Sequence, residues 1–92
     1  MWEEELLNRL DRAKSEVTFD PHVFDRAVYW NLNLDNVEET VRTGTIFGEK
    51  CEEPNKLCFK RFFGKENMTY TVIVRYHQDF IEVKTVWSNK GK

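Results

Sequence analysis

Apolar and polar residues alternate from Met68 to Trp87, on both sides of a short polar break at residues 77–79. Because successive side chains of a β-strand point to opposite faces, this period of two predicts two antiparallel strands joined by a tight turn. The side chains expected on the buried face are Tyr70, Val72, Val74, Tyr76, Ile81, Val83, Thr85 and Trp87. The other face is mixed, so the pattern predicts a sheet with one buried and one accessible face.

The first half of the chain has a helical pattern, with apolar residues at three- and four-residue intervals. One helix is expected from residue 2 to about residue 15, with Leu10 in its apolar stripe. A second helix should begin at Asp20-Pro21, because Asp caps free backbone N–H groups and Pro suits the first helical position. It should run to about Trp30. Its inward residues are expected to be Val23, Phe24, Ala27 and Val28.

A third, short helix is expected at Asp35, where Glu38 completes a capping box. Gly44 should end it in a position that favours positive φ. Two further strands are expected at residues 45–51 and 57–63, around a turn at residues 53–55. Residues 16–19 are interpreted as an extended connector.

Short loops between consecutive strands require antiparallel pairing. The sequence therefore predicts an α+β fold, with two or three N-terminal helices packed on a four-stranded antiparallel meander sheet. At 92 residues the chain is expected to be one domain, residues 1–92.

The chain contains no apolar run of about 18 residues, and its first residues are acidic where a secretory signal is basic and then apolar. We therefore expect a cytoplasmic protein with no membrane contact. In that setting Cys51 and Cys58 are expected to be reduced thiols. If residues 54 and 55 centre a turn, the two cysteines oppose each other, and a redox pair or part of a metal site are alternatives. Their spacing is not that of a zinc knuckle, so no metal and no cofactor are expected.

Charge is unevenly distributed, although the net charge is only −2. Residues 1–49 contain eleven acidic and five basic residues, whereas residues 50–92 contain nine basic and five acidic ones. A basic half suits phosphate or an acidic partner. Solvated acidic helices and lysine-edged strands would produce the same distribution.

His22 and Arg26 are one turn apart on the second expected helix, where both can reach one phosphate. RNA cleavage without a metal needs a base for the 2′-hydroxyl and cations for the developing negative charge. His22 or His77 can move the proton, and Arg26, Arg75 and Lys84 can supply charge. The structural alternative is that His22 bonds a neighbouring backbone group and Arg26 pairs with an acid such as Glu82 or Glu49.

The expected register places Arg75 opposite Glu82 and Ile73 opposite Lys84. A cross-strand ion pair between Arg75 and Glu82 is therefore favoured over a substrate clamp.

A second basic group, Lys56, Lys60, Arg61 and Lys65, is interleaved with phenylalanines and is typical of single-stranded nucleic-acid binding. Arg61 should lie on the opposite strand face from Lys60. Core packing of the phenylalanines, with lysines protecting a sheet edge, explains the same pattern. Trp2 and Trp87 are expected to pack within the protein and not to bind a ligand.

Four features of the chain, taken together, resemble a known family. They are Asp20-Pro21, the His22 and Arg26 pair, the helix closed by Gly44, and the ending at residues 81–87. The resemblance is to the domain of unknown function 4258 family, and more distantly to BrnT-like toxins, both grouped with the RelE-type toxin fold. It covers residues 19–87 and leaves the helix in residues 1–18 as an addition. It implies a RelE-like architecture, RNA cleavage and an antitoxin partner.

Two functions follow from these observations. The first is a type II toxin-like RNA endonuclease, or an inactive relative, that uses His22, Arg26, Arg75 and Lys84. The alternative is a non-catalytic interaction module that binds a protein partner or a second copy through a sheet edge or the helical face. Fold analogy by itself does not decide between them.

Overall fold

Three α-helices and a five-stranded sheet make up the part of the chain that the computed structural model describes, residues 2–9 and 11–92. The elements in chain order are α1 (Trp2–Arg9), β1 (Glu16–Phe19), α2 (Pro21–Trp30), α3 (Leu34–Thr43), β2 (Thr45–Ile46), the short 3-10 helix η1 (Gly48–Lys50), β3 (Lys56–Phe63), β4 (Met68–Tyr76) and β5 (Phe80–Lys90). The α+β class predicted from the sequence is confirmed.

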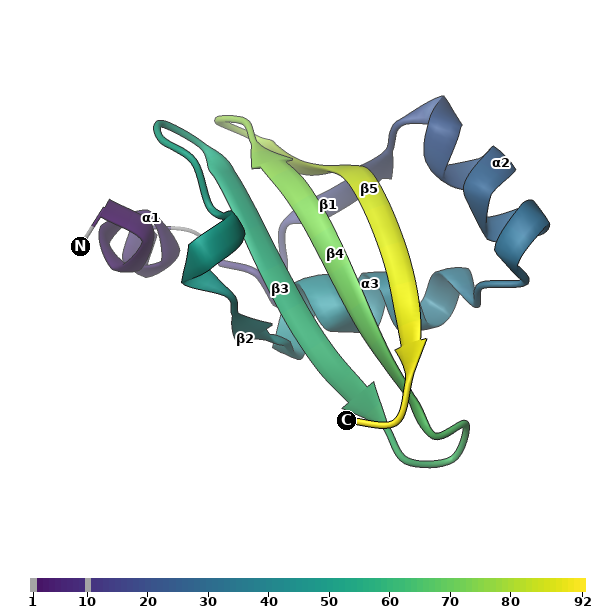
Figure 1. The fold of residues 1–92 in the computed structure, drawn as a ribbon. Helices are drawn as coiled ribbons and strands as arrows, with labels where there is room; N and C mark the ends of the chain where they lie inside the picture. The colour runs from purple at the N-terminus through teal and green to yellow at the C-terminus, as the bar shows by residue number, and fades with distance from the viewer. Residues whose placement is uncertain (1, 10) are drawn as a thin grey trace.

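The sheet is mixed, with strand order β1-β5-β4-β3-β2 (Figure 1). Strands β2 to β5 form the antiparallel meander expected from the sequence. The prediction of four strands is wrong at the other edge, where β1 pairs parallel to β5, from Glu16 opposite Phe80 to Phe19 opposite Val83. A four-residue strand whose partner is more than sixty positions away leaves little trace in local sequence.

The expected strand at residues 45–51 is shorter than predicted. β2 contains only Thr45 and Ile46, and the chain then turns into η1. Cys51 consequently follows a 3-10 turn and is not part of a strand opposite Cys58.

A β-bulge in β5 changes which side chains face the core. Val74 pairs with Val83, but Ile73 pairs with Thr85, so Lys84 is an extra residue in the ladder. Side-chain alternation shifts by one position after it. Val86 is therefore buried, while Thr85, predicted to face the core, is only half-buried and lines a cleft described below.

The core lies between one face of the sheet and the helices. α3 contacts β3 and β4, and α2 contacts β5; Figure 1 shows α3 behind the sheet. The buried cluster comprises Leu6, Val23, Val37, Val41, Leu57, Phe59, Tyr70, Val72, Val74, Ile81, Val83 and Val86. The face of the sheet opposite α3, hereafter the open face, has no helix across it in Figure 1.

α2 begins as predicted, with Asp20 as its N-cap and Pro21 at its first position. The prediction of its inward-facing residues is only half right. Val23 and Ala27 are buried, but Phe24 is 46% and Val28 84% exposed. α2 packs along the β5 side of the molecule, so only a narrow stripe of it is covered.

The other two helices differ from the predictions at their ends. α1 stops at Arg9, and residues 12–14 form a turn; Leu10 lies outside the described residues. α3 is capped by the side chain of Asn33, not by Asp35. Gly44 follows it in an extended conformation, and a Cβ there would collide with the carbonyl oxygens of Thr40 and Lys60. Close packing, not positive φ, therefore requires this glycine.

None of the described helices has both the length and the apolar character needed to cross a membrane.

Candidate functional site: a cationic cleft between α2 and the sheet

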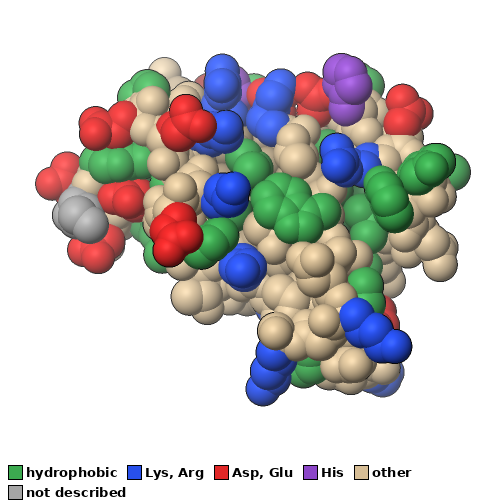
Figure 2. All heavy atoms as spheres, viewed as in Figure 1, with side chains coloured by type: hydrophobic (Ala, Val, Ile, Leu, Met, Phe, Trp, Pro, Cys, Tyr) green, Lys and Arg blue, Asp and Glu red, His purple; other side chains and the backbone are tan. Residues whose placement is uncertain are grey.

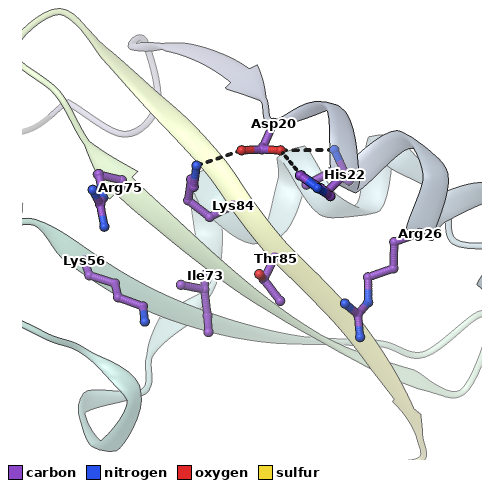
Figure 3. A pocket seen from close by; sticks show the side chains of 9 residues that line it. Asp20, His22, Arg26, Lys56, Ile73, Arg75, Lys84 and Thr85 are labelled. Carbon is purple, nitrogen blue, oxygen red and sulfur yellow. Dashed lines mark hydrogen bonds and ion pairs between the residues drawn. The ribbon is translucent and has the colours of Figure 1, made fainter.

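A cleft of about 520 Å³ lies between the start of α2 and the sheet. Its charged lining residues are Asp20, His22, Arg26, Lys56, Arg75 and Lys84, and its other lining residues are Val23, Ile73 and Thr85. Figure 3 shows these side chains converging from α2, β3, β4 and β5. We call this feature the cationic cleft, because Arg, Lys and His outnumber its one carboxylate.

All four residues predicted to be catalytic line this cleft. His22 and Arg26 come from α2, Arg75 from β4 and Lys84 from the bulge in β5. The sequence pattern predicted them as a group but did not place α2 beside β5. Two further lining residues were not assigned to this site: Asp20 was interpreted only as a helix cap, and Lys56, which pairs with Arg75 in the β3–β4 register, was assigned to the second basic group.

Asp20 holds the site together by binding two of its members. Its Oδ2 accepts a hydrogen bond from the Lys84 ammonium at 2.7 Å, and its Oδ1 lies 2.7 Å from Nδ1 of His22 (Figure 3). The same Oδ1 accepts the backbone N–H of His22 at 3.0 Å, which caps α2. These hydrogen bonds, first from Lys84 and then from His22, hold the pKa of Asp20 far below its usual range.

The Asp20 carboxylate therefore stays ionised and acts only as an acceptor. Because the carboxylate only accepts, Nδ1 of His22 donates this hydrogen bond, and in a neutral imidazole Nε2 is then the acceptor. The hydrogen bond that Lys84 donates to Asp20 also keeps Lys84 charged, because it raises the pKa of the ammonium. The structural alternative for His22, a bond from its ring to a neighbouring backbone group, is not what the structure shows, because the ring binds the Asp20 carboxylate. The side chain is 90% exposed, and Nε2 has no partner among the described residues.

Arg26 and Arg75 make no side-chain hydrogen bond or ion pair with any residue in the described ranges. The expected register is correct for Arg75, which faces Glu82 across the strands. The expected ion pair between them is not formed. Glu82 instead binds Nε2 of His77 at 2.9 Å and lies 3.7 Å from Lys84. Both guanidinium groups are consequently available to an anion.

The second basic group is not assembled into one surface. Lys60 is exposed and lies over the Phe47 ring at 4.3 Å. Arg61 is on the α3 side of the sheet, as expected, and there donates to Glu39 at 2.7 Å and to Thr43 at 2.6 Å. Lys65 lies in the turn between β3 and β4. Lys56, the fourth member of the group, lines the cationic cleft instead, and the Arg61 side chain is still 37% exposed.

Side-chain chemistry elsewhere is limited. Cys51 and Cys58 are free thiols, and the Cys51 sulfur accepts the backbone N–H of Cys58 at 3.4 Å. Burial raises the pKa of Cys58 to about 11, so this thiol is unreactive at neutral pH. Among the described residues no three His, Cys, Asp or Glu side chains are grouped as a metal site.

Acidic and basic side chains are unevenly distributed over the visible surface. In Figure 2 most acidic side chains lie at the α1 end, with a few more along the top edge, and basic side chains are spread over the open face with hydrophobic ones between them. This distribution reproduces the charge asymmetry of the sequence in three dimensions. An anionic ligand is therefore attracted to the side of the molecule that contains the cationic cleft.

Comparison of the chain with models of known families, with curated proteins and with solved structures found no match.

Proposed function

We propose that the protein is an RNA endonuclease of the type II toxin class that cleaves without a metal at the cationic cleft. One observation carries the proposal: His22 and Arg26 on α2 line a single cleft with Arg75 on β4 and Lys84 on β5, which are distant from α2 in sequence. Two of these cations lack partners in the described structure, and the third is held in place by Asp20. A cleft with this lining is suited to a phosphodiester.

The chemistry assigns a separate role to each group. Nε2 of His22 accepts the proton of a ribose 2′-hydroxyl, whose oxygen attacks the adjacent phosphorus. The bond from phosphorus to the 5′ oxygen breaks, and water, which reaches the open cleft, protonates that oxygen. Arg26, Arg75 and Lys84 stabilise the charge that develops on the phosphoryl oxygens. The products are a 2′,3′-cyclic phosphate and a 5′-hydroxyl.

The resemblance to the domain of unknown function 4258 family and to RelE-type toxins implies the same reaction. The proposal therefore includes a RelE-like architecture for residues 19–87 and an antitoxin that neutralises the protein. The α+β layers and the meander β2–β5 are compatible with it. A neighbouring gene that encodes an antitoxin, or growth arrest on expression, would support this part of the proposal.

The test is incubation of the purified protein with end-labelled single-stranded RNA in the presence of EDTA. We expect fragments that end in 2′,3′-cyclic phosphate, and a loss of about 100-fold or more in rate for His22→Ala, in line with general-base catalysis. His77→Ala is the matched control. Its ring binds Glu82 and stacks on Phe80 and does not line the cleft, so its rate should stay near that of the wild type.

Three results would count against the assignment. Equal losses from His22→Ala and His77→Ala would remove the specific role of His22. RNA binding without any product would indicate a relative that has lost activity. Absence of both binding and cleavage would overturn the proposal. Because His22 is exposed, His22→Ala should fold normally, and a loss of activity should not come from misfolding. Circular dichroism of the variant checks this directly.

A second candidate function is a non-catalytic module that forms a homodimer through α2. It is favoured by the exposed side chains Phe24, Val28, Tyr29 and Trp30, of which Val28 and Tyr29 are 84% and 79% exposed. Contiguous exposed apolar side chains commonly mark protein interfaces. Sedimentation analysis of the wild type and of Val28→Lys tests this function. A monomer at all accessible concentrations would remove it.

A further inference from the structure

The cationic cleft continues into a second, aromatic hollow along α2. This tryptophan hollow, of about 310 Å³, is lined by Arg26, Trp30, Met68, Trp87 and Ser88. Arg26 lines both, so the two hollows adjoin at its side chain. A third hollow follows, which shares Trp30, Met68 and Ser88 with the second. The seam between α2 and β5 is therefore one groove with a cationic end and an aromatic middle.

The groove has a regular spacing that comes from its two walls. On α2, His22, Arg26 and Trp30 recur every four residues, and each step advances about 6 Å along the helix. On β5, Thr85 and Trp87 are two residues apart, which is about 6.6 Å along a strand. Both walls thus lead from a residue that lines the cationic cleft to a tryptophan over a similar distance, from Arg26 to Trp30 on α2 and from Thr85 to Trp87 on β5.

Trp30 and Trp87 are accessible for different structural reasons. Trp30 ends α2 with 61% of its surface exposed, and its edge-on partner Tyr29 is more exposed still. Trp87 was expected to pack in the core. The bulge at Lys84 moves it out of the buried row, so it is only half-buried and lines the hollow. Two indole side chains therefore border one small hollow beside an unpaired guanidinium.

We infer that this groove binds single-stranded RNA, with a phosphate in the cationic cleft and a neighbouring base stacked in the tryptophan hollow. The inference rests on the proposed function, and it adds the substrate class and the means of selecting it. Aromatic side chains bind the faces of unpaired bases, and basic side chains bind the backbone. Bases inside a duplex are stacked on each other and cannot enter, so the groove should reject double-stranded RNA.

The volume of the tryptophan hollow supports a single base as its occupant. Its 310 Å³ is at the lower end of the range of about 300–1,000 Å³ for small-ligand pockets. Stacking requires no particular pattern of hydrogen bonds, so sequence preference at this position should be weak. The adjoining positive charge favours a nucleotide over an uncharged aromatic ligand, because Arg26 can bind the phosphate while the base occupies the hollow.

The experiment uses the full chain and a short 2′-O-methyl RNA, which lacks the attacking hydroxyl and so binds without being cleaved. Affinity is measured by fluorescence anisotropy. We expect Trp30→Ala to weaken binding by roughly 5- to 150-fold, the range for loss of one stacked base. Val28→Ala is the matched control, since Val28 is 84% exposed on the same helix and lines neither hollow, whereas Tyr29 contacts the Trp30 ring. The affinity of Val28→Ala should be unchanged.

A second probe requires no change to the protein and avoids the half-buried Trp87. In it, each base in turn is replaced by an abasic site in the same 2′-O-methyl backbone. Removal of one base should weaken binding as much as Trp30→Ala does, and Trp30→Ala should have no further effect on that probe. The corresponding duplex should bind much more weakly than the single strand.

The possible failures are distinguishable. Equal binding of abasic and intact probes, with Arg75→Ala still weakening both, would overturn the stacking inference and leave the proposed function standing. No binding of either probe would overturn both. If Trp30→Ala and Val28→Ala equally shift the sedimentation of the protein and neither affects RNA binding, the aromatic end of α2 is a contact between copies of the chain, which also overturns the inference.

Discussion

Thr71 is a buried residue whose hydroxyl is unpaired. Only 1% of the residue is exposed, and its Oγ1 has no hydrogen-bond partner among the described residues. Thr40 is also fully buried, but its hydroxyl donates to the carbonyl oxygen of Asn36 at 2.7 Å. The two threonines therefore differ in hydrogen bonding while sharing burial, and the sequence itself does not distinguish them.

This difference predicts opposite effects of the same substitution. Thr71→Val should raise the free energy of unfolding by about 1 kcal/mol, because it removes a buried polar group that lacks a partner. Thr40→Val should lower it by about 1 kcal/mol, because it deletes a hydrogen bond. Urea denaturation followed by circular dichroism measures both. A destabilised Thr71→Val would mean that the hydroxyl is satisfied in solution.

At the scale of elements, α2 is joined to β5 by Asp20, which caps the helix and binds Lys84 in the bulge. The folded protein holds the pKa of Asp20 below its usual range, whereas the unfolded chain has an ordinary carboxyl pKa of about 3.9. Acidification through about pH 4 therefore protonates the unfolded state first. The stability that this interaction contributes is present above that pH and is lost below it.

We expect the thermal midpoint of the wild type to fall between pH 5 and pH 3, and this fall to be smaller in Asp20→Asn. Asparagine also caps helices well, so this variant removes the charge and keeps the cap. Lys84→Met should reduce the same fall in thermal midpoint. The double variant should reduce it little further, since both substitutions break one interaction. Scanning calorimetry across this pH range is the measurement. Additive effects would show that the two residues are not coupled.

At the scale of the whole molecule, the basic half of the chain forms the three long strands β3, β4 and β5, and the acidic half supplies the α-helices and the short edge strands β1 and β2. Binding of RNA to the cationic cleft should release counterions, so log affinity should fall linearly with log salt, by about 0.7 for each phosphate contacted. Arg75→Ala should reduce the slope by about 0.7. Lys14→Ala, an exposed residue outside the cleft, should leave it unchanged. Titrations between 50 and 300 mM salt, roughly a sixfold range around physiological strength, measure both slopes. An unchanged slope for Arg75→Ala would place the phosphate elsewhere.

Local sequence was sufficient for the features that depend on neighbouring residues. Alternation at residues 68–76 predicted β4, and Asp20-Pro21 predicted the start of α2, because strand faces and helix caps are set within a few positions. The prediction of which β5 side chains face the core is wrong after Val83. One extra residue reverses the facing of all that follow, and a bulge has no strong sequence signature. The His22 and Arg26 pair was visible for the same local reason, since both lie on one helix.

The sequence by itself determined the α+β class, the start of α2, the meander and the charge division between the halves, all of which depend on local spacing and composition. Only the tertiary structure decided that β1 adds to β5, that Lys84 bulges, and that α2 lies beside the sheet. These three features depend on contacts between distant segments, which pair a strand edge and cover apolar surface. The cationic cleft, which is built from four such segments, exists only at that level.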